Sequence, residues 1–324
     1  MENSLKIDTF CSRLTNKGRS RNTIAMYKFI LTQFFSQYTT KNWSEITNED
    51  IENYIQWKTD KSIERKTTNK TGRGFGRMID GVGKLKQSTI NLSLSALRKF
   101  FFFCEMNALA ENIELGKVER WIPQEIDLDL IESIFKNKNI TELKSIVKDT
   151  MKKKNKNHDE VIDQFYIDRN ALCFYLLFNL GLRIGECTNL KKESLKFNLT
   201  QPTIIVTGKT GQRTIPVSQT IVDEVNNYIH VYPIVDYIFI RKTGGVLSVN
   251  TLKTYIWEIF RIGLETKYHA HSLRHAFATF LIDRGEAIQD VQQLMGHSSM
   301  NTTAAYLDSI KGRVKKSSNP IDFM

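Results

Sequence analysis

The sequence has few cysteines and lacks a long hydrophobic run, and both features narrow the class of protein. Its four cysteines, among 324 residues, are far apart and show neither metal-binding nor disulfide-framework spacing, so we expect free thiols in a reducing cytoplasm. The longest apolar run, 172–182, is interrupted by Asn179 and Gly181 and falls short of the ~20 residues that span a bilayer. The first residues, MENSLKIDTFCSRL, hold no long apolar stretch, so we expect no secretory signal and a cytoplasmic location.

The composition indicates a soluble globular protein with a basic surface. Hydrophobic residues make up 41% and charged residues 25%, which is ordinary, and the length suffices for two domains that each bury a core. The net charge of +11 is less ordinary. A basic surface favours polyanionic partners, either nucleic acid or an anionic membrane face. Because the sequence offers no membrane segment, nucleic acid is the better prediction.

Residues 1–110 are expected to form an all-helical domain. Ser20 can cap a helix whose apolar side chains recur at three- and four-residue steps through Phe35. A second helix is expected after Thr47 and a third over 88–105, where one face is apolar and the other is polar without acidic residues.

Two segments of this half carry turn-forming or basic residues. Residues 61–86 contain eight Lys or Arg against two acids, and their glycines and low apolar content predict a mobile loop over 66–86. Such a loop is equally consistent with a solvated linker and with a segment that follows phosphates. Residues 111–124, with Gly116 and Pro123, are predicted to connect the domains.

The second domain is assigned to 125–310, followed by a C-terminal tail at 311–324. A helix is expected at its start, then a lysine-rich insertion over 136–160, then a helix over 165–180. The runs 203–207 and 213–217, joined by GKTGQ, predict a β-hairpin, and the run 237–240 is expected to pair beside it. The fold class is therefore mainly α with a small antiparallel β-sheet.

A histidine-rich stretch, HSLRHAFATFL at 271–281, raises the question of a metal site. His271 and His275 are four residues apart, but no cysteine pair lies near them and the intervening Arg274 would repel a cation, so we predict no metal. His271 and Arg274, three residues apart, would instead project to one side of a helix, where guanidinium matches phosphate oxygens. The stretch therefore predicts an anion site, with His275 as a packed structural ring and His269 unassigned.

Further residues extend this pair into an ordered pattern, R…K…H-x-x-R…G-H…Y, with steps of 3, 23 and 9 residues between its last four members. The pattern, with the phrases LRHAFAT, LMGHSS and TT-x-x-Y, resembles the tyrosine recombinase (phage integrase) family and its Xer-type branch. The resemblance implies a helical core-binding domain followed by a catalytic domain. The six residues that carry it are Arg183, Lys209, His271, Arg274, His297 and Tyr306.

The resemblance also implies a role for each residue. Tyr306 would attack the phosphodiester and store its energy as a 3′-phosphotyrosyl ester, so that no cofactor is needed. Arg183 and Arg274 would hold the non-bridging oxygens, and Glu186, three residues after Arg183, would orient it. Lys209, at the hairpin tip, would protonate the departing 5′ oxygen. His271 would assist proton transfer and His297 would donate a hydrogen bond to the phosphate.

The predicted partner is a double-stranded recombination site, held by both domains. Dimers to tetramers are expected on DNA, with exchange of the C-terminal tail between subunits. The candidate DNA-binding residues of the first domain, each of which could equally belong to a solvated polar face, are Arg19, Arg21, Lys28, Lys84, Lys86, Asn91 and Arg98.

The predicted activity is site-specific recombination, either integration and excision of a mobile element or resolution of chromosome dimers. Two alternatives stay open at this point. One is a type IB-like topoisomerase, which shares the nicking chemistry without exchanging strands. The other is a DNA-binding relative that has lost catalysis.

Overall fold

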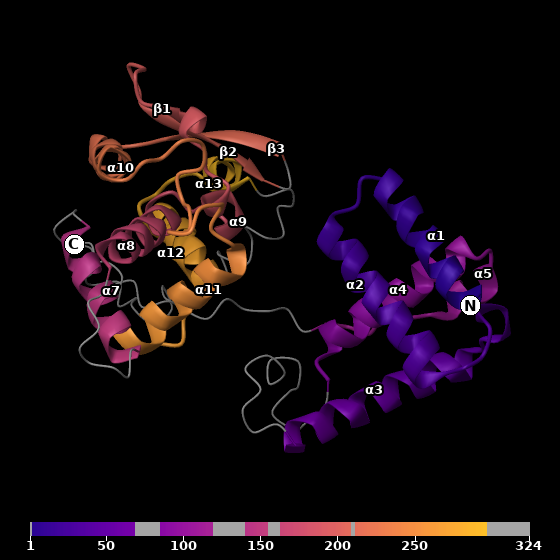
Figure 1. Ribbon diagram of the computed structural model, residues 1–324. Coiled ribbons are helices and arrows are strands. Elements are labelled where there is room, and N and C mark those ends of the chain that lie inside the picture. The colour runs from indigo at the N-terminus through magenta and orange to yellow at the C-terminus, as the bar shows by residue number, and fades with distance from the viewer. Residues whose placement is uncertain (1, 69–84, 119–139, 155–162, 209–210, 297–324) are drawn as a thin grey trace, which may run out of the picture. The chain divides into compact units, whose positions relative to one another are not determined.

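The chain forms two compact units in the computed structural model, Met1–Arg120 (unit 1) and Trp121–Met324 (unit 2) (Figure 1). The structure describes residues 2–68, 85–118, 140–154, 163–208 and 211–296. The boundary after Arg120 falls within the segment 111–124, where the sequence predicts the connection. The predicted tail, 311–324, lies outside the described residues.

Unit 1 is helical in all its described elements. Its core is rich in aromatic rings, such as Phe100 of α4, which lies 5.6 Å from Phe10 of α1 and 5.5 Å from Phe35, ring centre to ring centre. These contacts join α4 to α1 and η1, and α4 also packs against α2 (Figure 1). The elements are α1 (Glu2–Asn16), α2 (Arg21–Gln33), the π-helix η1 (Phe34–Tyr38), the 3-10 helix η2 (Trp43–Glu45), α3 (Asn48–Thr68), α4 (Gln87–Phe103) and α5 (Asn107–Asn112).

The helices predicted in this half are confirmed. The Ser20 side chain accepts a hydrogen bond from the main-chain N–H of Thr23, which satisfies one of the free donors at the start of α2. Helices α3 and α4 occupy the positions predicted after Thr47 and over 88–105. Helix α3 continues to Thr68, so the first residues of the predicted loop 66–86 are helical. The remainder of that loop, 69–84, lies outside the described residues.

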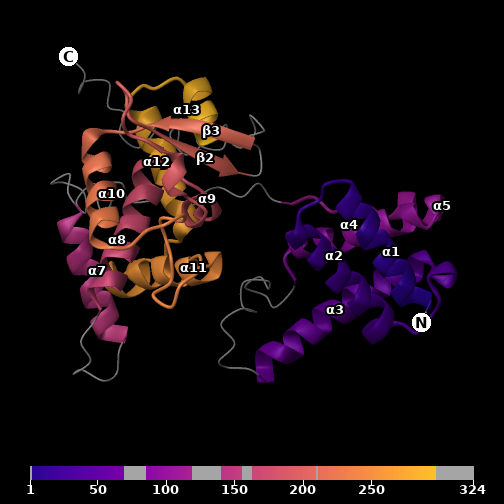
Figure 2. The same cartoon turned by 45° about the horizontal axis from the view of Figure 1, so that its top comes forward.

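Unit 2 is built around α8 (Gln164–Asn179), whose side chains are buried almost all round. Figure 2 shows α8 inside the unit, with α7, α10 and α12 along its sides. A helix that is apolar on every side needs such a cover. The other elements are α7 (Thr141–Lys154), α9 (Ile184–Thr188), the 3-10 helix η4 (Lys192–Ser194), β1 (Leu195–Lys196), β2 (Thr203–Gly208), β3 (Gly211–Pro216), α10 (Gln219–Val231), α11 (Val249–Glu258), the π-helix η5 (Ile259–Gly263), α12 (Ala270–Asp283) and α13 (Ile288–Met295).

The small sheet is antiparallel with the strand order β1-β2-β3. The predicted hairpin is confirmed as β2 and β3, paired from Thr203 opposite Pro216 to Gly208 opposite Gly211. The prediction that 237–240 pairs beside it is wrong, because β1 occupies that edge. Tyr237 and Ile240 form isolated bridges with Lys191 and Val246, and Ile238 and Phe239 are both fully buried. They pack into the helical core instead.

Residues 141–154 of the lysine-rich segment 136–160, predicted as an insertion, belong to the core of unit 2. These residues form α7, which packs on α8 and buries Leu143 and Val147, 0% and 1% exposed. The lysines that suggested an insertion lie in the last turn, where cations interact favourably with the helix dipole. One of them, Lys154, pairs with Glu258 at 3.0 Å.

Candidate active site

Residues from the start of α9, from β3 and from α12 converge on one buried carboxylate, that of Glu186. Its side chain is 2% exposed. The Oε1 atom of Glu186 lies 2.8 Å from Nη1 of Arg183 and 2.7 Å from Nη1 of Arg213. Nη1 of Arg274 lies 3.9 Å from the other oxygen, Oε2. Segments separated by up to 91 positions along the chain are thus brought to one point.

Arg183 stands at the start of α9, where its main chain and side chain bind the same carboxylate. Its N–H donates to Glu186 Oε2 at 2.8 Å, as a capping interaction does, and Nη1 donates to Oε1 at 2.8 Å. Nη2 donates to the carbonyl of Gly296 at 2.7 Å. Glu186 therefore orients Arg183, as the sequence predicts, and the third contact ties Arg183 to the end of α13.

Arg274 lies on α12 and is 1% exposed. Its Nη1 donates to the carbonyl of Gly181 at 2.5 Å and its Nη2 donates to the carbonyl of Met295. Gly181 has a left-handed φ of 57°, and an added Cβ would lie 2.4 Å from the Phe277 ring. Glycine is therefore required at this turn, which presents its carbonyl to the arginine.

His271 lies one turn before Arg274. Its ring packs edge to face against that of His275, with ring centres 4.9 Å apart, and His275 is buried, as predicted for a structural ring. Partial burial, and then the positive charges of Arg274 and Arg183, lower the pKa of His271. The imidazole is therefore held neutral at neutral pH, the form that accepts a proton. His269 caps α12, where its main-chain N–H donates to the Ser272 hydroxyl at 3.2 Å.

Sequence reasoning missed Arg213, whose guanidinium binds both oxygens of Glu186. Nη1 and Nη2 donate to the two carboxylate oxygens at 2.7 and 2.9 Å, a bidentate pair, and Nε donates to the carbonyl of Leu294 at 2.7 Å. One signal was present in the sequence. Arg213 shares a face of its strand with the buried Ile215, and a charge at such a position requires a partner inside the fold.

Arg213 and Arg183 keep Glu186 ionised despite its burial. Burial raises the pKa of the Glu186 carboxyl, but the hydrogen bonds from Arg213 and Arg183 and the charge of Arg213 outweigh it and hold this pKa at about 2. Three guanidinium groups thus share one negative charge, so the cluster keeps an excess of positive charge.

Lys209, His297 and Tyr306 lie outside the described residues, but the residues before the first two belong to the cluster. Gly208, which precedes Lys209, approaches Glu186 so closely that an added Cβ would lie 2.5 Å from Oε1. Gly296, which precedes His297, ends α13 with a φ of 62° and accepts the hydrogen bond from Arg183.

The candidate DNA-binding residues of unit 1 fall into different environments. Arg19, Arg21 and Lys86 are exposed, and Lys28 is exposed but pairs with Asp8 at 2.7 Å. Lys84 lies outside the described residues. The Asn91 amide donates to the carbonyl of Gly116 at 2.7 Å and accepts from its N–H at 3.1 Å, and the Arg98 guanidinium lies 5.7 Å from the ring centre of Phe102.

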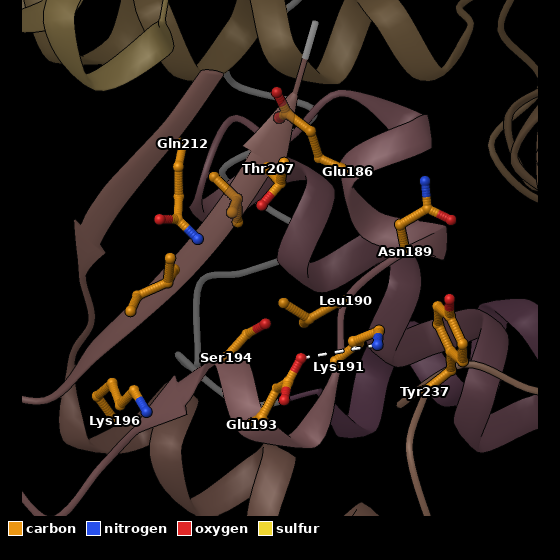
Figure 3. Close-up of a pocket in the computed structure, with 12 residues that line it drawn as sticks. Glu186, Asn189, Leu190, Lys191, Glu193, Ser194, Lys196, Thr207, Gln212 and Tyr237 are labelled. Atoms are coloured by element: carbon orange, nitrogen blue, oxygen red, sulfur yellow. Dashed lines mark ion pairs between the residues drawn. The ribbon is translucent and has the colours of Figure 1, made fainter. Parts of the chain in front are cut away.

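A polar cavity of about 510 Å³ lies between α9, η4 and the outer face of β2 (Figure 3). Lys191, Glu193 and Tyr237 line it, and the first two form an ion pair of 3.6 Å. Glu186 lines it and none of the three arginines does, so this cavity borders the arginine cluster on the side of the carboxylate.

Other features bear on the class of protein. Within the described ranges, no helix is long and apolar enough to cross a membrane, and no three potential metal-ligating side chains are grouped together. The four cysteines are free, as the sequence predicts, and all four are buried.

Comparison with known proteins gives consistent matches. The model of the phage integrase family matches residues 139–313. The chain is 27% identical over 314 residues to the tyrosine recombinase XerA of Pyrococcus horikoshii, covering 94% of this chain and 89% of XerA, and 24% identical over 332 residues to XerD of Shewanella oneidensis, covering 96% and 94%.

Solved structures share the fold at lower identity. The chain resembles the XerH site-specific recombinase bound to a palindromic difH substrate, with a TM-score of 0.66 and 18% identity over 97% of this chain and 83% of XerH. It also resembles the Tn1549 transposon integrase in complex with transposon right end DNA, with a TM-score of 0.63 and 14% identity over 98% and 99%.

Proposed function

The chain belongs to the phage integrase family, the tyrosine recombinases, and on that premise we propose that its arginine cluster binds the scissile phosphate of a double-stranded DNA recombination site. The observation that carries this proposal is the meeting of Arg183 and Arg274 at Glu186, beside the end of α13. The enzyme is a site-specific DNA recombinase, which cleaves and rejoins strands.

The proposed chemistry uses the positive charge of the cluster. Attack on a phosphodiester places additional negative charge on the non-bridging oxygens, and preorganised guanidinium groups stabilise that charge. Arg183 and Arg274 would donate to these oxygens, with Glu186 holding Arg183 in place. His271, neutral at neutral pH, can accept a proton in the same region.

The remaining roles complete the reaction. The Tyr306 phenol oxygen would attack phosphorus, forming a 3′-phosphotyrosyl bond as the bond from phosphorus to the 5′ oxygen breaks. Lys209 would give the proton that the leaving 5′ oxygen takes up, and His297 would donate a hydrogen bond to the phosphate. The roles of Lys209 and His297 are supported by the preceding glycines, since Gly208 lies against Glu186 and Gly296 accepts a hydrogen bond from Arg183.

DNA and further copies of the chain are the proposed partners. Two structures with this fold, XerH and the Tn1549 integrase, hold DNA. The exposed Arg19, Arg21 and Lys86 are proposed to contact phosphates from unit 1. Dimers to tetramers on DNA, tail exchange through 311–324 and a cytoplasmic location belong to the same proposal.

A nicked suicide substrate tests the proposal directly. The wild-type protein should form an SDS-resistant adduct with DNA, and Tyr306→Phe should form none. If both proteins form the adduct, the nucleophile is another residue. Incubation with two recombination sites then identifies the activity, since a recombinase yields exchanged strands whereas a topoisomerase yields only relaxed DNA.

A further inference from the structure

We infer that Arg213 is a positioning residue of the cleavage reaction, which frees Arg183 and Arg274 to bind the phosphate and fixes the hairpin that carries Lys209. This inference rests on the proposed function. It starts from the position of Arg213 on β3, where its side chain, 12% exposed, contacts α9 through Glu186 and α13 through the Leu294 carbonyl.

Arg213 neutralises the charge of Glu186 that would otherwise be shared by the other two arginines. A buried carboxylate attracts every nearby cation, and a guanidinium paired with it has less charge to offer a phosphate. Arg213 satisfies both oxygens of Glu186, whereas Arg183 uses only one of its Nη atoms there and Arg274 stays 3.9 Å away. Without Arg213, Glu186 would draw Arg183 and Arg274 into tighter pairs. Three guanidinium groups and one carboxylate leave a charge of about +2, which matches the doubly negative transition state of phosphoryl transfer.

Arg213 also holds the hairpin in a fixed position relative to Glu186. Arg213 is paired with Val206 in the hairpin, and the register ends at Gly208 opposite Gly211. Residue 209 therefore follows within a few positions of a side chain that is anchored at three polar atoms of other elements. The same side chain packs against the end of α13, where an added Cβ on Gly296 would lie 3.2 Å from Arg213 Cδ. One residue thus fixes the hairpin and the segment leading to His297 relative to Glu186.

The test is single-turnover cleavage of the nicked substrate at saturating protein, with DNA affinity measured separately. Arg213→Met is expected to lower the first-order cleavage rate on the order of 100-fold, the effect of a displacement of about 1 Å in an active site. Arg213→Lys, which keeps one charge, should recover part of this loss. DNA affinity should stay within about 3-fold, since Arg213 is not proposed to touch DNA.

Two readouts separate this role from a purely structural one. If Arg213 acts through Glu186, the double variant Arg213→Met/Glu186→Gln should cleave no more slowly than the slower single variant. The acid side of the pH–rate profile should also shift to higher pH in Arg213→Met, because Glu186 loses its principal cationic partner. Losses that multiply in the double variant, together with an unshifted profile, would overturn the inference.

The control is Arg261→Met, which removes the same charge and bulk from an exposed site where the guanidinium stacks 4.8 Å from the Trp257 ring centre. It should cleave like wild type. If Arg213→Met does not fold, Arg213→Lys decides, and a wild-type rate for that variant would reject the inference. If all Arg213 variants form the adduct at the wild-type rate and the adduct still requires Tyr306, only this inference is refuted. If the adduct forms without Tyr306, the proposed function is refuted.

Discussion

Replacing Glu186 with glutamine should remove a stabilisation of unit 2 that depends on pH. The folded pKa of this carboxyl is about 2, against an ordinary value of 4.5, and the side chain is 2% exposed. At about 1.4 kcal/mol for each pH unit, the ionised carboxylate contributes about 3 kcal/mol at neutral pH. Because the folded pKa is the lower one, this contribution is complete above pH 4.5 and is lost as pH falls toward 2.

The measurement is calorimetric unfolding of wild type and Glu186→Gln at pH 7 and pH 3, where the transition that the substitution shifts reports on unit 2. The stability difference between the two proteins should shrink by about 2 kcal/mol between these values, because most of the linkage is lost by pH 3. Glu193→Gln, at a site 76% exposed in an ion pair of 3.6 Å, serves as control and should show little change. An equal difference at both pH values would refute the idea that the arginines hold Glu186 ionised.

Three further predictions address the hairpin, unit 1 and DNA. Gly208→Ala should lower the single-turnover cleavage rate at least 10-fold with little loss of DNA affinity. The new methyl group would lie 2.5 Å from Glu186 Oε1 and displace the hairpin. An unchanged cleavage rate would contradict this close approach. The stability of Lys58→Met relative to wild type should fall as pH rises from 8 to 10.5, because burial lowers the pKa of Lys58 to about 8 and the charged form costs stability below that pH. The loss of its hydrogen bonds to Tyr54 and Ser93 adds a difference that does not depend on pH, and a difference in melting temperature that is constant over this pH range would count against the prediction. DNA affinity should fall steeply between 50 and 200 mM salt if several phosphates are neutralised, and a flat dependence measured by fluorescence anisotropy would exclude the basic surface as the binding face.

The sequence predicted the elements whose side-chain pattern is local. The helix capped by Ser20 and the hairpin of β2 and β3 have periodicities that neighbouring residues alone impose. Composition misled in α7, where lysines outnumber the few apolar residues that pack on α8. The run 237–240 has β-type residues, yet its burial in the helical core depends on elements far away in the sequence.

Several residues of the arginine cluster could be predicted from the sequence, but the contacts among them could not. Arg183, Glu186 and Arg274 were named from the pattern, and the structure brings them together. Arg213 could not be found in this way, because its partner Glu186 lies 27 positions earlier and the contact exists only after β3 packs against α9. The roles of His297 and Tyr306 continue to rest on the resemblance and family membership.

The burial of Arg274 has a consequence for how rapidly the enzyme can respond to its substrate. Water around a guanidinium must normally be rearranged before the group can meet a phosphate, and that rearrangement adds to the barrier of each turnover. Here the carbonyls of Gly181 and Met295 replace water around the Arg274 guanidinium. The desolvation of this group therefore takes place once, when the chain folds. In the proposed function, an incoming phosphate would then exchange with fixed main-chain dipoles rather than with bulk solvent.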